Sequence, residues 1–117
     1  MRRRTDIVSY ISEIAKAMEG LDGQIDSVFY RIEEVIRSGG KIIMLGNGGS
    51  LAIAQHFAQD LLKLGGARAM TINCPSVITA YSNDDGFENS FVLPVMRFIE
   101  TGDLIIIFSC SGDSKNY

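Results

Sequence analysis

The loop Gly46-Asn-Gly-Gly-Ser50 carries the pattern with the clearest chemical meaning in this sequence. It joins the apolar run 41–45 to a helical pattern that begins at Ser50. Glycines permit positive φ values and a close approach of the backbone, so successive N–H groups can converge on an anion, and the start of a helix adds its dipole. A tight turn alone does not require this composition. The loop therefore predicts an anion-binding site.

A second loop, 109–114, contributes three hydroxyl groups, from Ser109, Ser111 and Ser114. Each of them can donate a hydrogen bond to a phosphate oxygen. An ordinary polar loop that caps the next helix is compatible with the same residues. A serine nucleophile is not expected, because the nucleophile-elbow pattern needs a glycine at position 109. Together the two loops make a phosphorylated small molecule the leading candidate ligand.

Two nucleotide-binding patterns are excluded by single residues of the first loop. Leu51 stands where the dinucleotide-binding pattern needs a third glycine, and no lysine follows the glycines as in a nucleotide P-loop. A flavodoxin-like redox domain is a weaker alternative, because the loop 109–114 has no aromatic residue to stack on a flavin.

Two further pairs of polar residues are candidates for the site. His56 and Asp60 lie four positions apart on a predicted helix, so they share one face and can hold a metal ion or place a base beside its partner. A hydrogen-bonded surface pair is the alternative. Asn83 and Asp84 are followed by Asp85 and Gly86, which is typical of a turn, although beside a sugar-binding crevice they could orient hydroxyls.

Hydrophobic periodicity places these residues on an α/β fold. The predicted strands are 41–45, 67–73 and 103–108, and the predicted helices are 5–19, 22–38 with Asp22 as N-cap, 50–64, 75–80 and 87–100, with a loop at 82–86 and a kink or restart at Pro94. This order predicts a three-layer αβα architecture with a parallel, flavodoxin-like sheet and strand 41–45 in its middle. Both loops should then meet in one crevice at the carboxyl edge of the sheet.

The chain is long enough for one domain, in which two amphipathic helices (1–39) precede an α/β core (40–117). The apolar stripes of these helices are wide enough to pack on a partner subunit, and packing within the core explains them equally well. An apolar fraction of 46%, a net charge of -3 and two cysteines indicate a cytoplasmic globular protein, with no disulfide framework, no nucleic-acid partner, no membrane span and no secretion signal.

Taken together, the residues resemble the sugar isomerase (SIS) domain family and, within it, the phosphoheptose isomerase group. The resemblance covers nearly the whole chain. It rests on two leading helices and on Gly46–Ser50, Gln55–Ala58, Ile78–Ala80, Asn83-Asp84, Gly86–Glu88, Gly102-Asp103 and Ser109–Ser114. It implies a homotetramer with active sites between subunits that converts sedoheptulose 7-phosphate to the aldoheptose phosphate, a precursor of surface lipopolysaccharide heptose.

The resemblance also implies roles for individual residues. Asn47, Gly48, Gly49 and Ser50 would contact the sugar phosphate, Ser109, Ser111 and Ser114 would hold the phosphate group, and Asn83 and Asp84 would hold sugar hydroxyls. His56 matches a zinc ligand of some members. Asp60 falls where such isomerases place a glutamate that serves as metal ligand and catalytic base.

The sequence departs from the family pattern in two ways. Asp60 is one methylene shorter than the family's glutamate, and a base must reach the carbon-bound proton for isomerisation through an enediol. The family also continues through further elements that supply a catalytic histidine and another metal ligand, so we expect a truncated and inactive form with an exposed apolar edge on strand 103–108. A non-catalytic sugar-phosphate sensor or scaffold is the alternative function.

Overall fold

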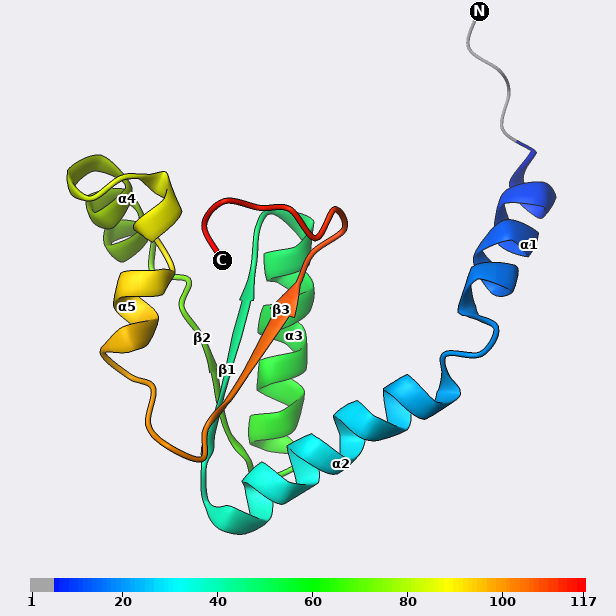
Figure 1. Ribbon diagram of the computed structural model, residues 1–117, viewed down its shortest axis with the longest axis horizontal. Helices are drawn as coiled ribbons and strands as arrows, with labels where there is room; N and C mark the ends of the chain where they lie inside the picture. Colours follow the sequence, from blue (N-terminus) through cyan, green and yellow to red (C-terminus); the bar gives the residue numbers. More distant parts are fainter. Residues whose placement is uncertain (1–5) are drawn as a thin grey trace, which may run out of the picture. The chain divides into compact units, whose positions relative to one another are not determined.

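The computed structural model describes residues 6–117, so the predicted helix start near residue 5 lies outside the described residues. Figure 1 shows the elements, which are α1 (Ile7–Met18), α2 (Asp22–Ser38), β1 (Lys41–Gly46), α3 (Gly49–Lys63), β2 (Arg68–Thr71), α4 (Pro75–Asp84), the short 3₁₀ helix η1 (Phe87–Asn89), α5 (Val92–Met96) and β3 (Leu104–Phe108). The chain divides into two units, Met1–Tyr30 and Arg31–Tyr117. No helix of the described residues is long and apolar enough to cross a membrane.

The first unit contains α1 and the beginning of α2. Asp6 caps α1 by accepting a hydrogen bond of 3.1 Å from the N–H of Val8. The prediction of Asp22 as the N-cap of α2 was wrong by one residue, because the Leu21 carbonyl accepts the N–H groups of Gln24 and Ile25. The apolar stripe of α1 is exposed, and Ile7, Ile11, Ile14 and Met18 belong to it.

The second unit is built on a parallel sheet in the order β2-β1-β3, as predicted. Ile42 of β1 pairs with Ala69 of β2 and with Leu104 of β3. Parallel strands end at the same edge, so the loops that follow β1 and β3 start side by side.

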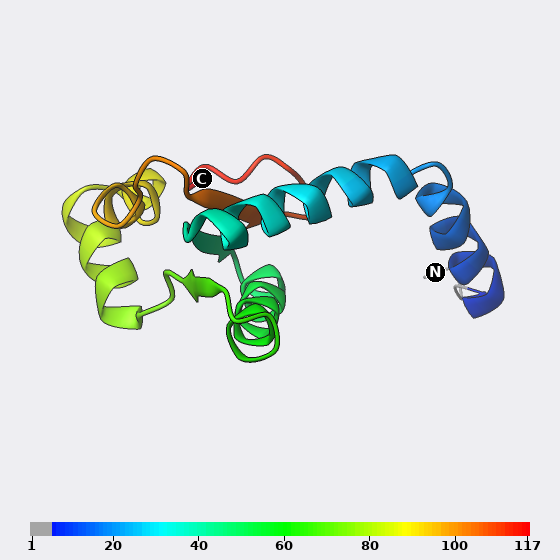
Figure 2. The same cartoon turned by 90° about the horizontal axis from the view of Figure 1, so that it is seen from below.

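Helices cover both faces of β1. Its side chains alternate between the faces, and Ile42, Ile43 and Met44 have no exposed surface. One face packs on residues of α2 and α3, which are Ile32, Val35, Ala54 and Ala58, and the other packs on Ile72, Phe91 and Val95. In Figure 2, α4 and α5 lie on one side of the strands and α3 on the other. The predicted three-layer arrangement is confirmed.

Strand β3 is only half covered. Leu104, Ile106 and Phe108 pack toward α2 and α3. Ile105 and Ile107 point to the opposite face and remain 40% and 46% exposed. The predicted exposed apolar surface at β3, an edge strand among the described residues, is therefore present.

Three element predictions need correction between β2 and β3. β2 is shorter than predicted, and α4 continues through Asp84, so residues 82–84 of the predicted loop 82–86 are helical. Serine, asparagine and aspartate disfavour a helix only weakly, and the helix ends just before Gly86, whose φ is 94°.

The predicted helix 87–100 is instead two short pieces, η1 and α5. Pro94 occupies the first turn of α5, where its missing N–H needs no partner within the helix. Of the two predicted effects of Pro94, a kink or a restart, the structure shows a restart of the helix.

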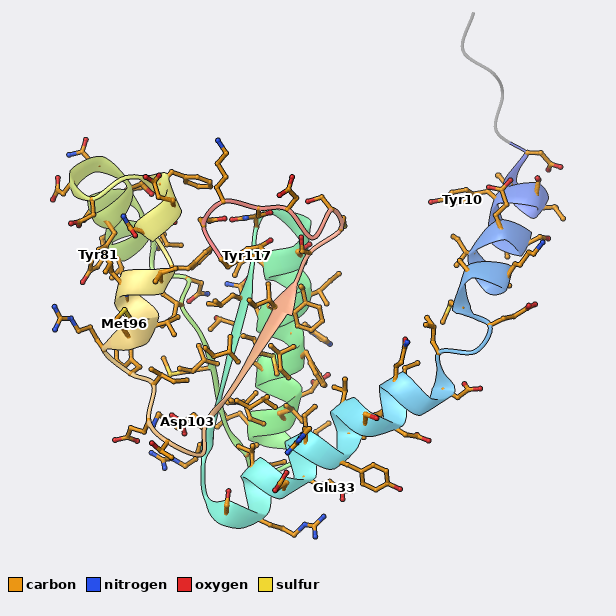
Figure 3. The ribbon with its side chains drawn as sticks, viewed as in Figure 1. Tyr10, Glu33, Tyr81, Met96, Asp103 and Tyr117 are labelled. Atoms are coloured by element: carbon orange, nitrogen blue, oxygen red, sulfur yellow. The ribbon has the colours of Figure 1, made fainter. Side chains whose placement is uncertain are left out.

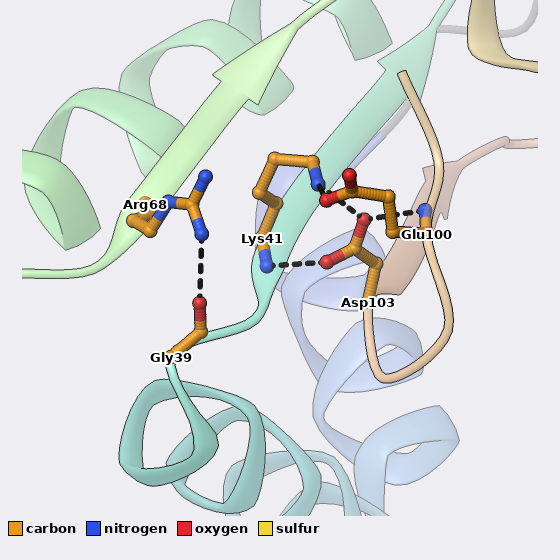
Figure 4. Close-up of polar contacts among 5 residues, drawn as sticks. All are labelled: Gly39, Lys41, Arg68, Glu100 and Asp103. Atoms are coloured by element: carbon orange, nitrogen blue, oxygen red, sulfur yellow. Dashed lines mark hydrogen bonds and ion pairs between the residues drawn. The ribbon is translucent and has the colours of Figure 1, made fainter. Parts of the chain in front are cut away.

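The amino ends of β1 and β3 are joined by charged groups (Figure 4). Asp103 accepts hydrogen bonds from the Lys41 N–H at 2.7 Å and the Glu100 N–H at 2.8 Å, and its carboxylate lies 2.8 Å from Lys41 Nζ. Lys41 Nζ also bonds the Glu100 carboxylate. The bonds from Lys41 lower the pKa of Asp103 to about 2, and those to Asp103 and Glu100 raise the pKa of Lys41.

We predict that Asp103→Asn destabilises the fold in a pH-dependent way. A depressed folded-state pKa stabilises the native protein above the unfolded-state pKa of about 4, and this stabilisation is lost as the pH falls through the folded-state value. The difference in unfolding midpoint between wild type and variant should therefore be largest above about pH 4 and narrow toward about pH 2. Thermal unfolding followed by circular dichroism from pH 2 to pH 7 measures it.

Glu100→Gln is the matched control, because the Glu100 side chain belongs to the same cluster and is 73% exposed. It should change the midpoint little at any pH. If the unfolding midpoints of the wild type and Asp103→Asn differ by the same amount at every pH, the depressed pKa of Asp103 does not stabilise the fold, and the prediction is wrong.

Candidate functional site

The loops after β1 and β3 face each other across one hollow. Its lining residues are Asn47, Gly49, Ser50, Ile53, Ser109, Cys110, Ser111, Ser114 and Tyr117. None of them is acidic, and most offer an N–H or O–H group. The predicted meeting of the two loops at the carboxyl edge of the sheet is confirmed, and the hollow suits an anion.

Two glycines shape the first loop for different reasons. A Cβ on Gly46 would lie 2.6 Å from the carbonyl carbon of Ser50, so the strand can turn into α3 here only without a side chain. Gly48 has a φ of 53°, which favours glycine.

The backbone of the same loop offers donors to a ligand. The N–H groups of Ser50 and Leu51 bond the carbonyls of Asn47 and Gly48. Among the described residues, no hydrogen bond occupies the N–H groups of Gly48 and Gly49. These groups lie at the positive end of the 15-residue helix α3, which favours a bound anion.

The second loop orients its hydroxyls by accepting backbone hydrogen bonds. Ser109 Oγ accepts from the Gly112 N–H at 2.9 Å, and Ser111 Oγ accepts from the Asp113 N–H at 3.2 Å. Because an N–H occupies one lone pair of each oxygen, the O–H of each serine remains available to donate. This is the polarity that a phosphate group requires.

Sequence reasoning missed two residues of this site, Asn116 and Tyr117. The amide of Asn116 makes reciprocal hydrogen bonds with the amide of Asn47, at 2.8 and 3.0 Å. The ring of Tyr117 packs on Phe91 with centroids 6.0 Å apart, and its hydroxyl donates to the Phe108 carbonyl at 3.3 Å. The spacing of residues in the sequence does not predict either contact, because Asn116 and Tyr117 meet their partners only once the sheet has formed.

The hydroxyl of Tyr117 lies among polar groups of both loops. The hydroxyls of Ser114 and Ser109, and the amide of Asn47, lower the pKa of Tyr117, because they stabilise its charged form. Groups that stabilise a phenolate at this position would also stabilise a phosphate oxygen.

His56 and Asp60 lie outside the lining of this hollow. His56 Nε2 is 3.5 Å from Asp60 Oδ2, and their side chains are 77% and 41% exposed. The pair borders a neighbouring shallow hollow on α3 together with Ala52, Ile53 and Phe57. Ile53 borders both hollows, so the two are adjacent along α3.

Asn83 and Asp84 are not brought into the hollow between the two loops. Both are exposed in the last turn of α4, where Asn83 Nδ2 donates to Asp84 Oδ1 at 2.7 Å. Their predicted contact with sugar hydroxyls stays a prediction.

A family model for the SIS domain matches residues 7–117. The chain therefore belongs to the SIS domain family. It is 34% identical over 119 residues to a phosphoheptose isomerase of Helicobacter pylori, covering 97% of this chain and 62% of that relative. It is 38% identical to a probable phosphoheptose isomerase of Thermoplasma acidophilum, covering 95% of this chain and 65% of the relative.

Solved structures agree with these sequence relatives. A phosphoheptose isomerase from Neisseria gonorrhoeae matches 94% of this chain with a TM-score of 0.81 and 29% identity, and 62% of that structure is covered. One from Francisella tularensis matches 99% of this chain with a TM-score of 0.82 and 28% identity, and 65% of it is covered. The chain thus spans about three-fifths of the length of its curated relatives.

We predict that Gly46→Ala destabilises the protein by about 1–3 kcal/mol, because the new methyl group meets the Ser50 backbone. Gly49→Ala is the matched control. A Cβ at Gly49, the first residue of α3, meets nothing within 4 Å, so stability should be unchanged or rise by up to about 1 kcal/mol. Urea unfolding measures both variants, and equal effects at the two positions would contradict this description of the turn.

Proposed function

We propose that this protein binds a sugar phosphate and interconverts its ketose and aldose forms, with sedoheptulose 7-phosphate as substrate and D-glycero-D-manno-heptose 7-phosphate as product. The observation that carries the proposal is the hollow in which two loops present N–H and O–H donors and no carboxylate. The relatives, all named phosphoheptose isomerases or probable ones, support this choice of substrate.

In this proposal the phosphate is held by neutral groups. The N–H groups of Gly48 and Gly49 and the side chain of Ser50 approach it from the start of α3, and Asn47 lines the same wall. Ser109, Ser111 and Ser114 donate from the opposite loop. Hydrogen bonds from such donors to a charged phosphate are stronger than those between neutral groups.

The reacting carbons would lie toward Asp60. Because Ile53 borders both hollows, an extended sugar with its phosphate between the loops would run along α3 toward His56 and Asp60. Asp60 would remove the proton from the hydroxyl-bearing carbon next to the carbonyl, giving an enediol, and would return it to the former carbonyl carbon, while the hydroxyl proton of the first carbon moves to the oxygen of the second. Its side chain is 41% exposed, so a substrate can reach it. Asn83 and Asp84 would contact sugar hydroxyls if α4 moves toward the ligand.

We also propose a zinc ion at His56 and Asp60. Their donor atoms are close together and exposed, which fits two of the four ligands that zinc takes. Among the described residues, no group of three His, Cys, Asp or Glu side chains could hold a metal, so the remaining ligands would come from elsewhere. Bound zinc would polarise the substrate carbonyl.

The assembly and location are proposed on similar grounds. The exposed apolar stripe of α1 supports a homo-oligomer, and the resemblance points to a tetramer. Two free, exposed cysteines suit a reducing cytoplasm. A biosynthetic role in supplying lipopolysaccharide heptose follows from the proposed product.

We predict that Ser111→Ala weakens binding of sedoheptulose 7-phosphate by about tenfold or more, because a hydrogen bond to a charged group contributes about 1.5–3 kcal/mol. Isothermal titration calorimetry measures the affinity. The control is Ser27→Ala, which removes an exposed hydroxyl that donates to the Gly23 carbonyl of its own helix and should leave binding unchanged. Equal binding of unphosphorylated sedoheptulose, or no binding by the wild type, would show that the substrate is wrong.

In a form of the protein that includes the family's further elements, we predict that Asp60→Asn lowers isomerisation by at least about a hundredfold while ligand affinity changes little, because general-base catalysis contributes about that much. Asp60→Glu restores a carboxylate and should retain activity. Nuclear magnetic resonance in deuterated water follows exchange of the carbon-bound proton, a step that the base performs directly. Asp85→Asn, which removes an exposed acid outside both hollows, is the control.

The same experiment tests the non-catalytic alternative. In that longer form, a wild-type protein that binds the sugar phosphate but catalyses no exchange, with or without Asp60→Glu, would be a sensor or scaffold and not an isomerase.

A further inference from the structure

Asn116 is a polar side chain in the interior of the candidate site. It is 1% exposed and makes three side-chain hydrogen bonds. Two of them form the reciprocal pair with Asn47, and in the third Asn116 Nδ2 donates to Ser90 Oγ at 3.4 Å. Ser90 is itself fully buried. Asn116 thus joins the loop after β1 to the segment before α5, from a position two residues after Ser114.

This arrangement satisfies a group that is costly to bury. An unpaired amide in the interior is destabilising, and among the described residues no buried side-chain nitrogen or oxygen lacks a partner. The pair with Asn47 spans 69 positions in the sequence, so it forms only when the sheet is folded. A well-satisfied pair of this kind specifies one relative position of the segments that it joins.

The pair also determines what Asn47 can do. One amide hydrogen and one lone pair of Asn47 are occupied by Asn116. The next two residues are Gly48 and Gly49, which have no side chains to fix them. The reciprocal pair, which we call the tether, therefore fixes the start of the segment that contains Gly48 and Gly49, and Gly49 lines the hollow.

We propose that Asn116 is a positioning residue that holds the glycine loop, through Asn47, in the conformation that binds phosphate. This inference rests on the proposed function. Because Asn116 follows Ser114 closely, the same contact also sets the distance between the two loops. Asn116 acts through Asn47 and not by touching the ligand, since it is buried and does not line the hollow.

A double-mutant cycle on Asn47 and Asn116 tests the inference, with inorganic phosphate as the probe and calorimetric affinity as the readout. Asn116→Ala and Asn47→Ala should each weaken binding by about tenfold or more. The double variant should be no weaker than the poorer single variant, within about twofold. Losses that add would show that Asn116 acts independently of Asn47 and would overturn the proposal.

Ser90→Ala is the control, because it removes the third hydrogen bond and leaves the reciprocal pair. It should bind phosphate within about twofold of the wild type. If Asn116→Ala does not fold, Asn116→Asp serves in its place, since its carboxylate has the same shape but cannot donate to Asn47. Phosphate affinity of Asn116→Asp equal to that of the wild type would overturn the proposal.

Amide hydrogen exchange of the ligand-free protein separates this inference from the proposed function. The N–H groups of Gly48 and Gly49 should exchange faster in Asn116→Asp than in the wild type, while those of β1 stay protected. No change at these glycines would overturn the positioning role. If Gly48 and Gly49 exchange faster in Asn116→Asp but the wild type does not bind phosphate, the positioning role of Asn116 is supported and the proposed phosphate site is wrong.

Discussion

The parallel pairing of β1 with β3 is the constraint on which the candidate site depends. Gly46, the last residue of β1, pairs with Phe108, the last residue of β3. Both loops therefore leave the sheet at the same level, and their donors converge on one hollow. A shift of this register by one residue would also move the side chains of β3 to the opposite faces of the sheet. Correct packing and a correctly formed site are thus consequences of the same pairing.

The contacts at the amino ends of β1 and β3 differ in charge from those at their carboxyl ends. At the amino ends, Lys41 and Asp103 hold β1 and β3 together with charged hydrogen bonds. At the carboxyl ends, the contacts are between neutral groups. In Figure 3, Asp103 and Tyr117 lie at opposite ends of the sheet. Because none of the residues that line the hollow is acidic, no lining carboxylate would oppose a bound phosphate, and backbone N–H groups and hydroxyls are available there as donors.

The strands and the convergence of the two loops could be predicted because they depend on local patterns. The apolar run 41–45 is buried on both faces, and the strand order follows from right-handed crossovers. The segment between β2 and β3 could not be predicted as well. There, α4 ends just before Gly86, α5 begins with Pro94 in its first turn, and burial of Phe91 and Val95 against the sheet determines the path of the chain. Long-range packing of this kind leaves no periodicity in the sequence.

The residues of the candidate site also include some that the sequence predicts and others that depend on long-range packing. Gly48 and the serines were predictable because a φ requirement or a hydroxyl is a property of one residue. The pairing of Asn47 with Asn116 was not, because it depends on two segments that only the folded sheet brings together. Its consequence is chemical. In the proposed function, with Asn47 partly occupied, a phosphate would be held by backbone N–H groups and hydroxyls, which recognise any phosphate monoester. Selection of one sugar must then come from groups along α3 and beyond, toward His56 and Asp60, where the carbon chain would lie.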